Sequence, residues 1–147
     1  MNTATSADGR PAAADRRRRS LRVSLYAIAF TQFVFGLVFL IPSTPVVELF
    51  GLRPPAPDWA NWLLTMMAAR FLGYAVGMVT AARAPHQHLA WINTMVVVQV
   101  IDWLATLTYL TAGALSLRQV STAAILPPLF IAALLWWHPG RDRHRDA

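Results

Sequence analysis

The chain has 147 residues, of which 56% are hydrophobic and only 14% charged, a composition too apolar for a soluble domain of this length. Its formal net charge is +6, and every basic residue is an arginine. Because cysteine is absent, disulfides, thiol redox chemistry and cysteine-ligated metal sites are excluded. We therefore expect one membrane domain. The arginines cluster in the two tails beside apolar segments, which argues against nucleic-acid binding.

The N-terminal region combines a polar tail with a first apolar segment. Residues 1–19 lack apolar periodicity and are predicted to form a disordered, arginine-rich cytoplasmic tail. A secretory or twin-arginine signal is the alternative, but the apolar run 23–41 is longer than a signal core and no small-residue cleavage site follows it. The pattern favours a retained first transmembrane helix, which Pro42 and Pro45 end.

Three further spans follow a short link. Residues 46–51 are apolar but too short to cross a bilayer, so we predict a short interfacial helix or turn there, before an extended proline-rich segment at 53–57. The spans are expected from Trp59 or Asn61 to Ala82, from about Trp91 to Ala112, and from about Val120 to Trp137. The predicted fold is an all-α bundle of four transmembrane helices over residues 20–139, with a charged cytoplasmic tail at 140–147.

The distribution of arginine predicts the orientation. The arginines near span ends are Arg16, Arg17, Arg18, Arg19 and Arg22 before the first span, Arg141, Arg143 and Arg145 after the last, and Arg53, Arg83 and Arg118 singly in the three links. Positive charge is enriched on the cytoplasmic side of membrane proteins. We therefore expect a multi-pass protein of the cell inner membrane with both termini in the cytoplasm.

Two charged residues interrupt the apolar segments. Arg70 and Asp102 each lie roughly ten residues from the nearest end of their segment, which at about 1.5 Å per residue places them near the middle of a hydrocarbon core about 30 Å thick. An ionisable side chain there costs at least about 2.5–3.5 kcal/mol and is usually inward-facing and partnered. Since the two charges are opposite and lie at similar depth on consecutive helices, the sequence predicts a buried Arg70–Asp102 pair.

Other polar residues are predicted at the same depth. Gln32 lies in the first span, Gln99 is three residues before Asp102 on the same helix face, and Tyr74 is one turn after Arg70. Gly73 and Gly77 have the spacing that allows two helices to approach closely.

Two prolines in the fourth span leave backbone carbonyls without their helical hydrogen bonds at this depth. Pro127 and Pro128 free the carbonyls of Ala123 and Ala124, which then need a donor within the membrane. The guanidinium of Arg70 could serve both Asp102 and such a carbonyl.

The role of this layer, Arg70, Asp102, Gln99, Gln32 and Tyr74, stays open at this point. It is either a structural core that fixes helix register, or a site that handles a polar headgroup, a quinone-like ring, an ion or a proton. His86 and His88 form a lone H-x-H in a loop, which is more typical of a solvated loop than of a metal site. Hydrolase, metalloprotease and nucleotide-binding motifs are absent from the sequence.

The layout resembles the DoxX-like group of small bacterial membrane proteins. The similarity covers about residues 23–138 and lies in the link VVELFGL, the second-span segment ARFLGYAVG with Arg70, Gly73 and Gly77, and the acidic Asp102. The resemblance implies a four-helix membrane fold. Some members of the group are associated with quinone-linked oxidoreductases, and no catalytic residue is implied for this chain.

The function expected from the sequence is that of a non-enzymatic or accessory integral membrane protein whose Arg70–Asp102 pair holds the core. One alternative is a transporter or small-ligand carrier that uses the polar layer. Another is a quinone-contacting membrane subunit of an oxidoreductase. The expected partners are the lipid bilayer, a quinone or other small lipophilic ligand, and a partner membrane subunit, and the sequence names no cofactor.

Overall fold

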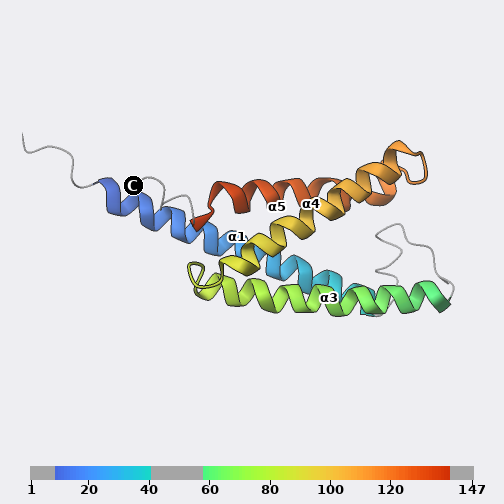
Figure 1. The fold of residues 1–147 in the computed structure, drawn as a ribbon, viewed down its shortest axis with the longest axis horizontal. Helices are drawn as coiled ribbons and strands as arrows, with labels where there is room; N and C mark the ends of the chain where they lie inside the picture. Colours follow the sequence, from blue (N-terminus) through green and yellow to red (C-terminus); the bar gives the residue numbers. More distant parts are fainter. Residues whose placement is uncertain (1–8, 41–57, 140–147) are drawn as a thin grey trace, which may run out of the picture.

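The fold comes from a computed structural model that describes residues 9–40 and 58–139. This part of the chain forms four helices: α1 (Gly9–Leu40), α3 (Asp58–Arg83), α4 (Leu89–Thr111) and α5 (Leu117–Trp136). Successive helices run antiparallel, so the 84–88 turn lies at the same end of the molecule as the start of α1 and the end of α5 (Figure 1). The segment predicted as an interfacial helix or turn and the charged C-terminal tail lie outside the described residues.

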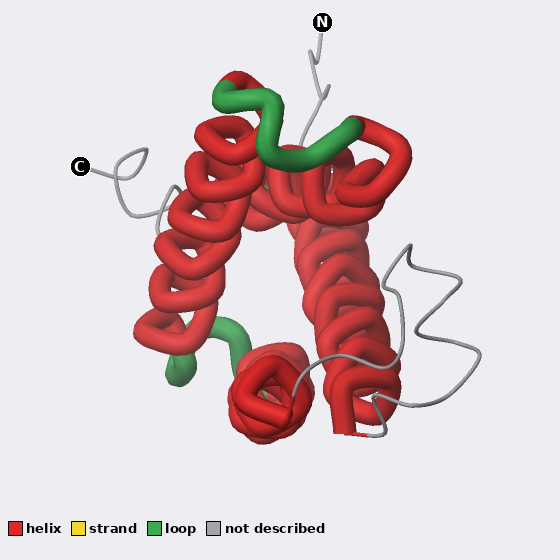
Figure 2. Tube along the Cα trace, turned by 90° about the vertical axis from the view of Figure 1, so that its right-hand side faces the viewer, coloured by secondary structure: helices red, strands yellow, loops and turns green. Residues whose placement is uncertain are grey.

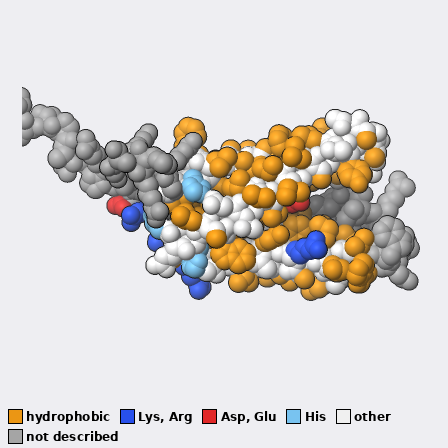
Figure 3. Space-filling model, viewed as in Figure 1, with side chains coloured by type: hydrophobic (Ala, Val, Ile, Leu, Met, Phe, Trp, Pro, Cys, Tyr) orange, Lys and Arg blue, Asp and Glu red, His pale blue; other side chains and the backbone are white. Residues whose placement is uncertain are grey.

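All four helices are long and apolar enough to cross a membrane, over residues 15–40, 62–83, 89–111 and 117–136. Their outer surfaces carry large hydrophobic side chains such as Phe30, Val76, Ile101 and Leu129, which are all more than half exposed. Hydrophobic side chains cover much of the face in Figure 3, where most basic side chains lie at one end and one further basic side chain lies within the apolar area. An apolar outer surface of this extent fits lipid rather than water. The four predicted spans are confirmed as helices, and their length and composition suggest a multi-pass membrane protein.

The first helix is longer than the sequence suggested. It begins at Gly9, so residues 9–19, expected in the disordered tail, are helical. Alanine and arginine are good helix formers, and Pro11 lies in the first turn, where a proline lacks only an N–H that would have no helical partner. The helix of the apolar segment therefore continues outward through the arginines.

The helices associate as two pairs, α1 with α3 and α4 with α5. A Cβ atom added to Gly36 of α1 would lie 2.8 Å from the side chain of Leu72 on α3, which shows how closely these helices approach. The ring of Phe71 packs against Phe35 and Phe39, with centroids 5.9 and 5.5 Å apart. These contacts keep α1 and α3 together toward the end farthest from the 84–88 turn.

The two pairs join through a core at the 84–88 end of the molecule. Its buried members come from all four helices: Leu21, Leu25, Ile28 and Ala29 of α1, Met78, Ala81 and Ala82 of α3, Ile92 and Met95 of α4, and Leu134 of α5. On α4 the buried residues end at Gln99. Beyond this level the pairs move apart toward the 112–116 loop (Figure 1, Figure 2).

The space around the two glycines of α3 shows where α3 and α4 separate. A Cβ on Gly77 would overlap the ring of Trp91 on α4, whereas one on Gly73 would meet nothing within 4 Å. The close helix approach predicted from the Gly73 and Gly77 spacing is therefore present at Gly77 alone. The 112–116 loop contains Gly113, whose φ of 69° is the left-handed conformation that commonly follows the end of a helix.

Candidate functional site

The predicted buried pair between Arg70 and Asp102 is not present. Both side chains are exposed, and no ion pair joins them. Arg70 lies thirteen residues before the end of α3 at Arg83, and Asp102 lies thirteen residues after the start of α4 at Leu89. The two residues thus share the predicted depth, but α3 and α4 have already separated at that distance from the turn.

Helical spacing shows which sides of α3 and α4 carry the two charges. Arg70 lies seven residues, or about two turns, before Gly77, the glycine that receives the Trp91 ring of α4. Asp102 lies about two turns after Met95, which is buried in the core. Each charge therefore lies on the side of its helix that contacts neighbouring helices near the 84–88 turn. It is exposed because the helices have separated at its level.

A buried amide cluster lies where α4 leaves the core. Gln32 of α1 and Gln99 of α4 are only 4% and 5% exposed. Both Nε2 groups point at the sulfur of Met95, with Nε2···Sδ distances of 3.7 Å from Gln32 and 3.5 Å from Gln99. A thioether is a weak acceptor, so these are weak hydrogen bonds that bring two helices together at one level.

The other end of the Gln32 amide is unsatisfied. Its Oε1 is buried and has no hydrogen-bond partner among the described residues. Exchanging the amide oxygen and nitrogen would not help, because the Met95 sulfur can only accept and one polar end would still lack a partner. A buried acceptor in this state costs about 1–3 kcal/mol.

Tyr74 borders the same region. It is half-buried on α3 and packs against the core cluster, one turn from the exposed Arg70. Of the five residues predicted for the polar layer, the structure thus buries Gln32 and Gln99 together, places Tyr74 against the core, and leaves Arg70 and Asp102 at the surface.

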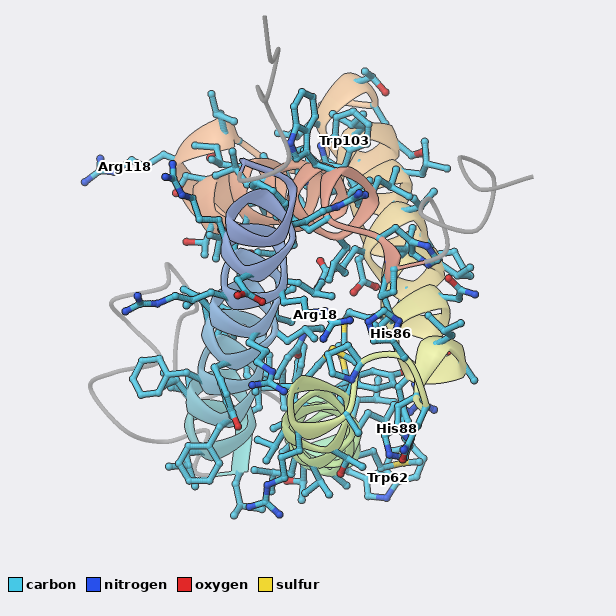
Figure 4. All side chains as sticks on the ribbon, turned by 90° about the vertical axis from the view of Figure 1, so that its left-hand side faces the viewer. Arg18, Trp62, His86, His88, Trp103 and Arg118 are labelled. Carbon is cyan, nitrogen blue, oxygen red and sulfur yellow. The ribbon has the colours of Figure 1, made fainter. Side chains whose placement is uncertain are left out.

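The carbonyl freed by Pro128 has the partner that the sequence demanded. The indole Nε1 of Trp103 donates to the carbonyl oxygen of Ala124 at 3.1 Å, the oxygen that an N–H at position 128 would otherwise bind. Figure 4 shows Trp103 on α4 beside α5. The donor is therefore an indole of the adjacent helix, and the guanidinium of Arg70 does not have this role.

Sequence reasoning missed Met95 and Trp103. Met95 has an apolar side chain in an apolar segment, although its position four residues before Gln99 put it on the polar face of α4. Trp103 follows Asp102 directly and is a donor-only side chain, which is the signal that could have matched it to the freed carbonyl.

A second polar junction lies at the 84–88 end. His138 Nε2 is 2.9 Å from Asn93 Oδ1, and Arg17 Nη2 donates to the His138 carbonyl at 3.4 Å. The end of α5 is thereby tied to α4 and α1. His86 is exposed and His88 half-buried in the turn, and the described residues contain no group of three histidine or acidic side chains that could hold a metal ion.

The amide cluster has one unused acceptor, the buried Oε1 of Gln32. Its two amides and its thioether include neither a nucleophile nor a general base. In comparisons with known proteins, no family model, no curated protein and no solved structure matches the chain.

Proposed function

We propose that the chain is a non-enzymatic protein of the cell inner membrane, with both termini in the cytoplasm, that binds a small lipophilic ligand at the Gln32–Met95–Gln99 cluster. The observation that carries this proposal is the buried Gln32 Oε1 without a partner in the described part of the chain. A ligand that donates a hydrogen bond would remove the cost of this acceptor, and a donor in hydrocarbon gains correspondingly from finding it.

The surroundings favour a ligand that is apolar apart from its donor. The core next to Gln32 consists of Ile28, Ala29 and Met95, with the half-buried Tyr74 packed against it. A ring with a hydroxyl group, such as a reduced quinone, matches one acceptor in an apolar wall. The resemblance to DoxX-like proteins, some of which are associated with quinone-linked oxidoreductases, agrees with this ligand class.

Binding fits the geometry better than transport. A transporter must open its site to each side of the membrane in turn, whereas here all four helices pack tightly between the cluster and the 84–88 end. An accessory role as the Arg70–Asp102 core requires a contact that the structure lacks. The proposed orientation rests on the arginines: among the described residues, Arg18, Arg19, Arg22 and Arg83 lie toward the 84–88 end, and Arg118 is the one arginine near the other end.

Native mass spectrometry of the protein purified in mild detergent tests the proposal. We expect a lipophilic, hydroxyl-bearing molecule to stay bound to the wild-type chain. The Gln32→Leu variant should lose it. When both proteins have been stripped of the bound molecule, the variant should unfold at the same or a higher temperature than the wild type, because leucine has a similar volume and removes an unsatisfied buried acceptor.

The matched control is Gln87→Leu, the same substitution at an exposed position of the 84–88 turn, which should retain the molecule. A bound species that survives Gln32→Leu unchanged, or a wild-type protein with no bound species when purified from its own membrane, would contradict the proposal. The measured mass then separates a quinol from other hydroxylated lipids.

A further inference from the structure

Two opposite charges stand exposed at mid-membrane on adjacent helices. Arg70 of α3 and Asp102 of α4 are both at the surface of the chain, within segments long and apolar enough to be spans. Ionisable side chains at this depth rarely face lipid and are generally paired. Within the described residues 9–40 and 58–139, Arg70 and Asp102 do not pair with each other, so each charge is available to a partner from outside the chain.

We propose that a second copy of this chain supplies them. The two copies form a dimer through the face made by α3 and α4, in which Arg70 pairs with the partner's Asp102 and Asp102 pairs with the partner's Arg70. This interface is separate from the Gln32–Met95–Gln99 cluster, and the dimer does not depend on whether a ligand binds there.

The symmetry of a dimer fits the positions of the two charges. Parallel copies in a membrane are related by a two-fold axis along the membrane normal, which leaves the depth of every residue unchanged. Arg70 and Asp102 lie the same thirteen residues from the 84–88 turn and therefore at closely similar depth. An axis between α3 and α4 places α3 opposite α4 of the second copy, so both contacts join opposite charges.

The residues one helical turn farther from the 84–88 loop also lie at equal depth on the two helices. Met66, four residues before Arg70, is exposed, and Thr106, four residues after Asp102, is half-buried. Both are seventeen residues from the adjacent end of their helix. In the proposed dimer, Met66 of one copy therefore lies near Thr106 of the other.

Charge reversal separates pairing between chains from pairing within one chain. The full-length chain is expressed in two differently tagged forms, Arg70→Asp and Asp102→Arg. Each form alone brings like charges together at both contacts of its dimer, whereas a mixed dimer joins opposite charges at both. We expect co-expression to give at least about tenfold more mixed dimer than either form gives dimer alone, in line with the cost of like-charge contacts.

A second measurement keeps both charges intact. Because the chain has no cysteine, tagged Met66→Cys and Thr106→Cys chains can be co-expressed and oxidised in the native membrane, where any disulfide between the two tags is intermolecular. We expect this disulfide, and none when Phe30→Cys, on the exposed outer side of α1, replaces Met66→Cys. Three results would each overturn the proposal: a wild-type protein that is monomeric in the membrane, equal cross-linking at Phe30, or mixed chains that associate no better than either form alone. A different membrane subunit or a lipid would then contact the α3 and α4 face.

Discussion

At the scale of single residues, several threonine hydroxyls in the spans are satisfied within their own helix. The hydroxyls of Thr31, Thr80, Thr106 and Thr108 each donate to the carbonyl four residues earlier, at 2.8–3.0 Å. Such bonds hide a hydroxyl from lipid at no cost in tertiary contacts. Other polar groups of the described residues reach beyond their own helix, among them the buried Gln32 amide and the Trp103 indole.

The two glycines of α3 give a matched test of packing. Gly77→Ala should destabilise the protein by about 1–3 kcal/mol, because its methyl group would overlap the Trp91 ring and force the helices apart. Gly73→Ala meets nothing within 4 Å, so it should be neutral or stabilise by up to about 1 kcal/mol through helix propensity. Unfolding in detergent, followed by circular dichroism, measures both. Equal losses at the two positions would show that α4 stays close to α3 beyond Gly77.

At the scale of helices, each pair is held together by its own contacts. The α1 and α3 pair relies on the Gly36 contact with Leu72 and on the ring of Phe71 against Phe35 and Phe39. In the α4 and α5 pair, the indole of Trp103 binds the Ala124 carbonyl beside the two prolines. A polar bond from one helix thus repairs the break that proline makes in another.

Trp103→Phe isolates that bond. Phenylalanine keeps most of the aromatic packing and removes the N–H donor, so we expect a loss of about 1 kcal/mol, rising toward 3 kcal/mol if the carbonyl is left dry. The control is Trp136→Phe, the same change at an exposed position near the end of α5, which should have little effect. Thermal unfolding of both variants checks the prediction, and it fails if Trp103→Phe is as mild as the control.

The sequence predicted the helices better than their association. Four apolar segments of spanning length, ended by features such as Arg83 and Gly113, predict the spans within a few residues, because hydrogen-bonding backbone in lipid leaves few alternatives to a helix. The sequence also predicted that Arg70 and Asp102 lie at a similar depth. Depth follows from counting along a helix, but contact depends on how two helices cross, and α3 is close to α4 at Gly77 and no longer close at Gly73. The buried pair was therefore predicted where the structure has two separated charges.

The candidate site was predictable in part for the same reason. Gln32 and Gln99 are polar residues in apolar segments and were found by that contrast. Met95 lacks the contrast, although its sulfur is the group that both amides approach. The unsatisfied Gln32 oxygen could be recognised only once the residues around it were known.

At the scale of the whole molecule, the fold consists of two antiparallel helix pairs joined by a core at one end (Figure 1). The amide cluster lies at the boundary between this core and the region where the pairs separate. Both the ligand site and the α3 and α4 face require that the helices cross a membrane and that the 84–88 turn and the 112–116 loop lie on opposite sides of it.

Thiol labelling in intact cells tests this arrangement most directly, because the natural chain has no cysteine and any single cysteine reports only its own position. His86→Cys lies in the exposed part of the turn and Ala114→Cys in the exposed far loop. A membrane-impermeant maleimide applied from outside, with the outer barrier opened and the inner membrane intact, should label Ala114→Cys and should reach His86→Cys only after the inner membrane is broken. Labelling of both positions from the same side would contradict the account, and labelling of His86→Cys alone would reverse its orientation.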